Sequence, residues 1–237
     1  DPGVMPADDR TPADAYDELA DSYAADLEAN PYNAHLDFPG TTSLVPDVAD
    51  RRILDAGCGG GRYTEWLLAA GAEVVGVDAS GEMLSEAQER VSDEAALHQV
   101  DLAGGLPFAA DAFDGIVSGL VLSYLEDWRA VFTEFARVLR PGGFLVFSTT
   151  HPFDEYPLPE AANYFEVEHT TKEWDVEIPY YRRPVGEILN PLLETGFRID
   201  DVLEPQPTEA FREAWPDRYE KESKRPVFFC VRAVAEQ

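Results

Sequence analysis

Three glycines and two aspartates near the start of the chain have the spacing of a ligand-binding loop. An apolar, strand-like run ends at Asp55 and is followed by Gly57, Gly59 and Gly61. Because glycine has no Cβ and tolerates positive φ, this loop can bring bare backbone against a ligand. Asp78 closes the next apolar run, and an ionised carboxylate can accept both hydroxyl protons of a ribose diol. The pattern predicts a pocket for a nucleoside-containing cofactor in an α/β sheet.

The spacing of the glycines indicates which class of cofactor to expect. A dinucleotide-binding fingerprint needs glycine at the first, third and sixth positions of the loop. Counted from Gly57, the sixth position is Arg62, so the fingerprint is not met. The run is instead Asp-x-Gly-x-Gly-x-Gly, which resembles motif I of the class I S-adenosylmethionine-dependent methyltransferases. The alternative is a glycine-rich turn with an unrelated acid downstream, and the order of the surrounding elements argues against it.

The resemblance implies S-adenosyl-L-methionine as the cofactor and S-adenosyl-L-homocysteine as the product. In that family the first acid and the glycine loop hold the methionine end, and the acid on the second strand binds the ribose. The cofactor-binding residues expected on this basis are Asp55, Gly57, Gly59, Gly61, Arg62, Asp78, Ala79, Met83, Asp101, Leu102, Ser118, Gly119, Tyr16 and Tyr23.

Several of these roles have an ordinary structural alternative. Asp101 lies where the family accepts the adenine amino proton, with Leu102 covering the ring, but a turn aspartate would have the same place. Met83 either flanks the adenine or packs on the sheet. Arg62 either is exposed or pairs with the cofactor carboxylate. Family members use the backbone at the position of Gly119 and its preceding serine for the cofactor's ammonium group.

The elements that must position these residues alternate between strand and helix. Strands are predicted at 52–56, 73–77, 96–100, 115–119, 144–148, 197–203 and 227–233, and helices at 62–70, 82–91, 127–139 and 184–193. This alternation is typical of an α/β fold with a doubly wound, mostly parallel sheet, here of seven strands. Residues 113–127 and 137–148 also resemble motif IV and the following helix, turn and strand of these methyltransferases.

The segment before the first strand is expected to be helical. Thr11 and Pro12 predict a helix start, and a second short helix is expected at 42–48. Apolar residues from Tyr16 to Leu27 lie along one helix face. This stripe either packs on the core or lets Tyr16 and Tyr23 close over the cofactor.

The segment 151–183 interrupts the alternation and is rich in aromatic residues, glutamate and proline. We expect a single methyltransferase domain over 1–237, with a helical cap at 11–50 and 151–183 as an inserted substrate cap. His151 follows the fifth strand, where a base could take a proton from an attacking hydroxyl or amine. Tyr181 is expected in the substrate pocket. A hydrogen-bonded structural histidine and an aromatic packing residue are the alternatives.

The composition is strongly acidic, with 46 Asp and Glu against 18 Lys and Arg and a net charge of −28. This bias resembles cytoplasmic proteins of extreme halophiles, where molar salt screens self-repulsion. A basic stripe for nucleic acid, a membrane-spanning run, a secretory signal and metal-ligand spacing are all absent from the sequence. Two cysteines do not form a disulfide framework.

We therefore expect a cytoplasmic enzyme that transfers a methyl group to a small molecule, with no nucleic acid, membrane or metal partner. The acceptor and the oligomeric state stay open. Two other functional classes are considered: a module that binds the cofactor without catalysis, and a nicotinamide-dependent oxidoreductase, which the glycine spacing disfavours.

Overall fold

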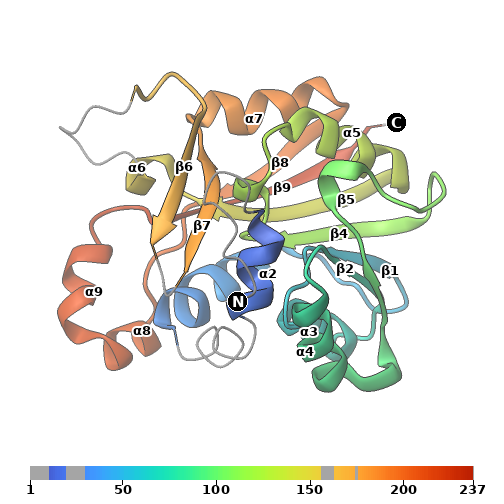
Figure 1. Ribbon diagram of the computed structural model, residues 1–237, viewed down its shortest axis with the longest axis horizontal. Helices are drawn as coiled ribbons and strands as arrows, with labels where there is room; N and C mark the ends of the chain where they lie inside the picture. Colours follow the sequence, from blue (N-terminus) through green and yellow to red (C-terminus); the bar gives the residue numbers. More distant parts are fainter. Residues whose placement is uncertain (1–10, 20–29, 156–162, 174–175, 237) are drawn as a thin grey trace, which may run out of the picture.

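A seven-stranded sheet with the order β3-β2-β1-β4-β5-β9-β8 forms the centre of the computed structural model, which describes residues 11–19, 30–155, 163–173 and 176–236 (Figure 1). The strands are β1 (Arg52–Ala56), β2 (Glu73–Asp78), β3 (Ala96–Gln99), β4 (Phe113–Gly119), β5 (Leu139–Thr150), β8 (Phe197–Leu203) and β9 (Phe228–Ala235). Strands β1 to β5 pair in parallel, and β9 is antiparallel to both of its neighbours. The predicted seven-stranded, mostly parallel sheet is confirmed.

Helices cover both faces of this sheet, as the alternation predicts. Helices α2 (Phe38–Leu44), α3 (Arg62–Ala69) and α4 (Gly81–Val91) lie on one face, and α5 (Trp128–Val138) and α7 (Val185–Glu194) lie on the other (Figure 1). Helix α5 shows why the sequence folds this way. It buries Trp128, Phe132 and Phe135 at helical spacing against the apolar residues of the sheet.

The region before β1 contains helices, but both predicted bounds of the second helix are wrong. Residues 12–19 are helical, and a second helix spans 31–44 with a π-helical segment at Asn33–Asp37. The expected helix at 42–48 ends at Leu44 because Val45 is extended, with ψ at 124°. Val45 precedes Pro46, and the proline ring disfavours the helical conformation of the residue before it.

The segment after β5 forms a short helix, α6 (Pro152–Glu155), and a separate antiparallel hairpin of β6 (Glu168–Glu173) and β7 (Glu177–Arg182). The glutamate-rich stretch before β9 contains α8 (Glu209–Ala214) and α9 (Pro216–Glu222). In the described ranges, we find no helix with the length and apolar character needed to cross a bilayer.

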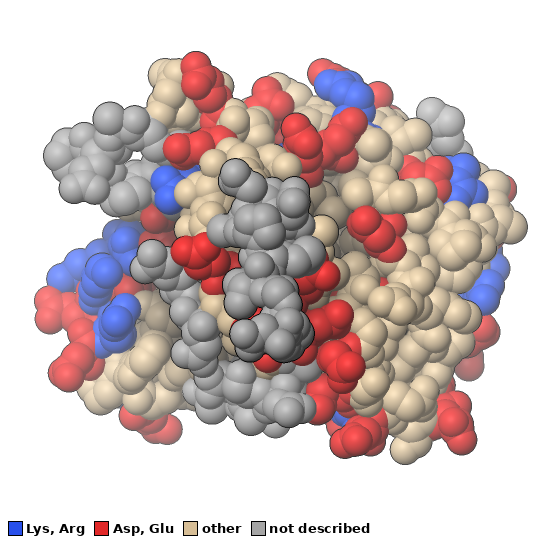
Figure 2. All heavy atoms as spheres, viewed as in Figure 1, with Lys and Arg blue, Asp and Glu red and all other residues tan. Residues whose placement is uncertain are grey.

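Charge is distributed unevenly over the face shown in Figure 2. Acidic side chains are spread widely, whereas basic ones gather mainly at the left, where α8 and α9 lie in Figure 1. Several of these bases pair with acids of the same region, including Arg225 with Glu222 and Lys224 with Glu220. These two bases are therefore already paired with neighbouring acids.

Candidate functional site

A cavity of about 540 Å³ lies at the carboxyl ends of strands β1, β2 and β4, within the size range of ligand sites. It is lined by eleven of the residues expected from the sequence: Tyr16, Gly57, Gly59, Arg62, Asp78, Ala79, Met83, Asp101, Leu102, Gly119 and Tyr181. Asp55, Gly61, Ser118 and His151 are not among its lining residues. Tyr23 lies outside the described residues. The cavity occupies the position where open α/β sheets bind ligands.

The glycine loop owes its shape to residues that must be glycine. Gly57, Gly59 and Gly61 have φ values of 78°, 51° and 83°. A Cβ on Gly57 would lie 2.3 Å from Cγ2 of Val121, which follows β4 and lines the cavity. A Cβ on Gly61 would lie 3.1 Å from Cα of Ala87 in α4. Gly57 thus shapes the cavity floor, whereas Gly61 allows α3 to start beside α4.

The Asp78 carboxylate joins the second strand to the glycine loop. Its Oδ2 accepts the Gly59 N–H at 2.8 Å, and its Oδ1 accepts the Ser80 N–H at 3.0 Å. Burial raises the pKa of Asp78, and these backbone hydrogen bonds act in the opposite direction. A carboxylate has about four lone-pair sites, so Asp78 can also accept two ligand hydroxyls while it holds the loop.

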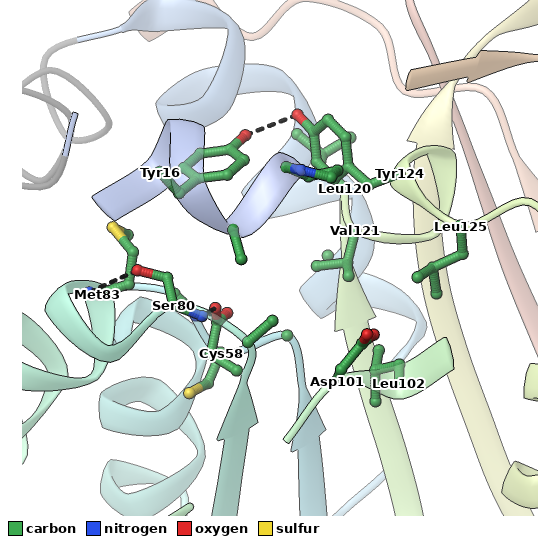
Figure 3. A pocket seen from close by; sticks show the side chains of 18 of the residues that line it. Tyr16, Cys58, Ser80, Met83, Asp101, Leu102, Leu120, Val121, Tyr124 and Leu125 are labelled. Carbon is green, nitrogen blue, oxygen red and sulfur yellow. Dashed lines mark hydrogen bonds between the residues drawn. The ribbon is translucent and has the colours of Figure 1, made fainter. Parts of the chain in front are cut away.

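Two buried apolar side chains, Met83 and Leu102, line the cavity, and the acid Asp101 lies next to Leu102 (Figure 3). Asp101 Oδ1 accepts the Ala103 N–H at 2.9 Å and caps a short 3₁₀ turn. Asp101 is therefore a turn aspartate and a lining residue at once, so the two interpretations of the sequence are compatible. A flat heteroaromatic ring suits this apolar slot.

Two of the predicted cofactor residues, Asp55 and Ser118, are buried beneath the cavity and connect the ends of the strands. Asp55 is fully buried, and its Oδ2 accepts the Thr64 hydroxyl at 2.6 Å. Burial raises the pKa of Asp55 to about 7, with the nearby Asp78 charge adding to the rise. The Ser118 hydroxyl donates to the Ala56 carbonyl at 2.8 Å. These contacts tie β1 to α3 and β4, and they place neither side chain in the cavity.

The helix over residues 12–19 crosses the mouth of the cavity (Figure 3). The hydroxyls of Tyr16 and Tyr124 are 2.6 Å apart. Asp17 accepts the Ser80 hydroxyl at the start of α4, which fastens the helix at a second point. Leu19 packs with Ile178 of β7 in a small buried cluster. Of the expected apolar stripe, the described residues serve both purposes: Leu19 packs in the core and Tyr16 lines the cavity.

The other end of the cavity was not found from the sequence. Its lining residues there include Asn33, Asp37, Phe38, Tyr63, Leu120 and Tyr124. Leu120 and Tyr124 could have been predicted, because they follow the carboxyl end of strand β4, where ligands bind in such sheets. Asn33, Asp37 and Phe38 carry none, because only the docking of their helix brings them to the cavity. Leu120 adopts a φ of 56°, a strained conformation of a kind found at functional sites.

The two residues proposed from the sequence for catalysis have different surroundings. His151 is buried away from the cavity lining, with Nε2 2.8 Å from Glu204 Oε1 and Nδ1 accepting the Phe153 N–H at 3.0 Å. Burial lowers the pKa of His151, while Glu204 opposes the shift. Both ring nitrogens are engaged, so the geometry favours the structural alternative. Tyr181 lines the cavity, and its hydroxyl donates to Glu126 at 3.4 Å.

Metal ligation finds no support in the part of the chain that the structure describes. In those residues, no group of three or more His, Cys, Asp or Glu side chains is arranged to hold a metal ion. The two cysteines, Cys58 and Cys230, are buried and free.

Residues 54–147 match the family described as "Methyltransferase domain". An uncharacterised protein of Haemophilus influenzae is 25% identical over 87% of this chain and 91% of its own length. A malonyl-[acyl-carrier protein] O-methyltransferase of Enterobacter lignolyticus is 32% identical over 62% of this chain. The chain spans only 56% of that protein's length.

Solved structures share the fold over most of the chain. An S-adenosylmethionine-dependent methyltransferase from Mesorhizobium loti is 29% identical, with a TM-score of 0.70 over 88% of this chain and 99% of its own. A Listeria monocytogenes protein, 24% identical, superposes with a TM-score of 0.77 over 90% of this chain and 100% of its own. The second comparison bears on the fold alone.

Proposed function

We propose that this chain, which belongs to the class I S-adenosylmethionine-dependent methyltransferases, transfers a methyl group from S-adenosylmethionine to a small-molecule acceptor by in-line displacement. One observation carries the proposal. A single cavity joins the glycine loop and the Asp78 carboxylate to a second, aromatic-lined end at β4. A cavity with two chemically different ends suits two molecules held side by side.

The residues present fit the cofactor. A Cβ on Gly57 would fill the room beside Val121, and a Cβ on Gly59 would lie 3.3 Å from Cε of Met83. Asp78 would hold the ribose hydroxyls, Asp101 and Leu102 the adenine, and the glycine loop the methionine part. When bound, the cofactor supplies a methyl group already made electrophilic by its sulfonium.

The protein's own contribution is orientation and the exclusion of water. The hydrogen bonds from Gly59 and Ser80 fix the Asp78 carboxylate before any ligand arrives, so little ordering is needed on binding. Tyr16 and Tyr124 close the mouth of the cavity through their hydroxyl contact. Arg62 is held with its guanidinium carbon 4.1 Å from the Phe38 ring centroid, where it can reach a ligand carboxylate.

The acceptor is proposed to be a small molecule because the cavity is of ligand size and is partly covered by the helix over 12–19. Relatives named for malonyl-[acyl-carrier protein] raise a carrier-bound acyl acceptor as a second candidate. That candidate is weaker, since the chain spans about half the length of such a relative.

A module that binds the cofactor without catalysis would present the same cofactor residues. Incubation with S-adenosylmethionine and a pool of small metabolites distinguishes the two functions. We expect S-adenosylhomocysteine to accumulate only when the metabolite pool is present. Tight binding of S-adenosylhomocysteine with no turnover on metabolites or acyl carriers would favour the binding module instead.

A further inference from the structure

A buried carboxylate at the end of the cavity near β4 and β5 has no role in the cofactor site described above. Asp37 lines the cavity although only 3% of its surface is exposed. Its Oδ2 accepts the Tyr63 hydroxyl at 2.8 Å, and its Oδ1 accepts the Thr41 hydroxyl at 3.3 Å. Ser148 of β5 also hydrogen-bonds to it. Burying a charge costs free energy unless such partners hold it, so its retention beside a cavity needs an explanation.

The surrounding backbone is shaped to hold this carboxylate. Asp37 ends the π-helical segment Asn33–Asp37, and such irregular helices are frequent at functional sites. A Cβ on Gly119 would lie 2.3 Å from Cε2 of Tyr63, so the tyrosine ring reaches Asp37 only because this position is glycine. The strained Leu120 donates its N–H to Ser148 Oγ at 3.2 Å, and Ser148 in turn contacts Asp37.

The sheet order separates Asp37 from the ribose-binding residue. Asp78 ends β2, whereas Asp37 contacts Ser148 on β5, three strands away in the order β2-β1-β4-β5. At about 4.8 Å between strands, this is a separation of roughly 14 Å along the sheet. Asp37 thus lies beyond the glycine loop, on the side of the cavity left for an acceptor.

We propose that Asp37 binds the methyl acceptor and that the acceptor is an amine carried on an apolar or aromatic body. The inference rests on the proposed function and deepens it. Carboxylates pair with ammonium groups, and the rings of Phe38 and Tyr63 and the Leu120 side chain offer an apolar wall to the rest of the molecule.

The charges lining this end favour an amine over a carboxylate. Asp37 is the acid among the residues named at this end, and Arg62, whose guanidinium packs on Phe38, is the base near it. The net charge of −28 further attracts cations and repels anions. A carboxylate acceptor would have to approach a buried acid of the same charge, which low-dielectric surroundings make costly.

The chemistry balances with Asp37 as proton acceptor. The ammonium gives one proton to the Asp37 carboxylate and becomes a neutral amine with a free electron pair. That pair forms the new C–N bond as the C–S bond of the sulfonium breaks, and the electrons of the broken bond stay on sulfur. Burial raises the pKa of Asp37, with Arg62 and the three hydroxyl donors opposing the shift, which suits a group that takes up a proton.

The test uses two probes that share a phenylethyl body and carry opposite charges, on protein saturated with S-adenosylhomocysteine. Isothermal titration should show 2-phenylethylamine binding about tenfold or more tightly than 3-phenylpropionate. In Asp37→Asn, the amine should lose about tenfold or more in affinity, as expected for a lost charge-assisted contact. Affinity for S-adenosylhomocysteine should stay within about threefold. Asp111→Asn is the charge-matched control, because Asp111 is exposed and asparagine tolerates its φ of 57°.

Tyr63→Phe provides a second variant in case Asp37→Asn does not fold. It removes the hydroxyl that orients Asp37, so amine affinity should fall by about threefold or more while the control keeps its affinity. Three results would overturn the proposal: no amine binding by the wild type, equal binding of the carboxylate probe, or loss of S-adenosylhomocysteine affinity in folded Asp37→Asn. If the wild type fails to bind S-adenosylhomocysteine at all, the proposed function itself is wrong.

Discussion

Replacing Asp78 with asparagine tests the ribose site while leaving most of the loop intact. The carboxylate now accepts two backbone N–H groups, from Gly59 and Ser80. Asparagine keeps one oxygen acceptor and so retains one of these bonds; losing the other costs about 1 kcal/mol. The larger loss falls on the ligand, because charge-assisted hydrogen bonds to a diol contribute roughly 1.5–3 kcal/mol. Affinity for S-adenosylhomocysteine should therefore fall by about tenfold to a hundredfold.

A double-mutant cycle assigns that loss to the ribose hydroxyls. Calorimetry would compare adenosine with 2′,3′-dideoxyadenosine on the wild type and on Asp78→Asn. The wild type should prefer adenosine by about tenfold or more, and the variant should show little preference. The melting temperature of the ligand-free variant should change little, because burial already raises the pKa of this acid and the substitution removes a buried charge. An unchanged preference for adenosine in the variant would place the ribose elsewhere.

Three other predictions follow from particular contacts. Gly57→Ala should weaken S-adenosylhomocysteine binding more than tenfold and should lower the melting temperature more than Gly142→Ala does. The two glycines have almost the same φ, 78° and 77°, but only a Cβ on Gly57 would meet a neighbour, Val121, at 2.3 Å. Equal effects of the two substitutions on the melting temperature would mean that backbone strain alone matters. Burial raises the folded-state pKa of Asp55 to about 7, so the protonated acid stabilises the folded protein. This stabilisation, on the order of 4 kcal/mol, is complete below the unfolded-state pKa and is lost as the pH rises through 7. Melting temperature should thus fall between pH 5 and 8, and less so in Asp55→Asn; parallel pH profiles would contradict this. The net charge of −28 should make the protein less stable after dialysis from molar salt to tens of millimolar, whereas a salt-independent melting curve would refute the comparison with halophile proteins.

The sequence predicts most of the fold because strand and helix periods alternate clearly from residue 52 onward. Strand β1 and strand β8 have the predicted bounds, α3 differs by one residue at its end, and α5 differs by one residue at each end. A local rule accounts for the early end of the helix expected at 42–48, since Val45 precedes a proline. Boundaries of this kind depend on single residues that periodicity does not register.

Most of the predicted part of the site consists of residues at or after the ends of strands. Asp78 ends β2 and Asp101 follows the end of β3 by two residues, so motif spacing places them at one edge of the sheet. Asp37 belongs to a helix that reaches the cavity by tertiary packing, which no local pattern indicates. His151 also follows a strand, but its N–H bonds to the Val227 carbonyl and its ring packs on Phe229, which turns it toward β9.

The most direct test of the account is a crystal structure of the protein with S-adenosylhomocysteine. The account predicts ribose hydroxyls within hydrogen-bond distance of Asp78, adenine between Met83 and Leu102, and the sulfur facing the end of the cavity that holds Asp37. A ligand bound outside this cavity, or seated with its adenine against Asp37, would contradict it.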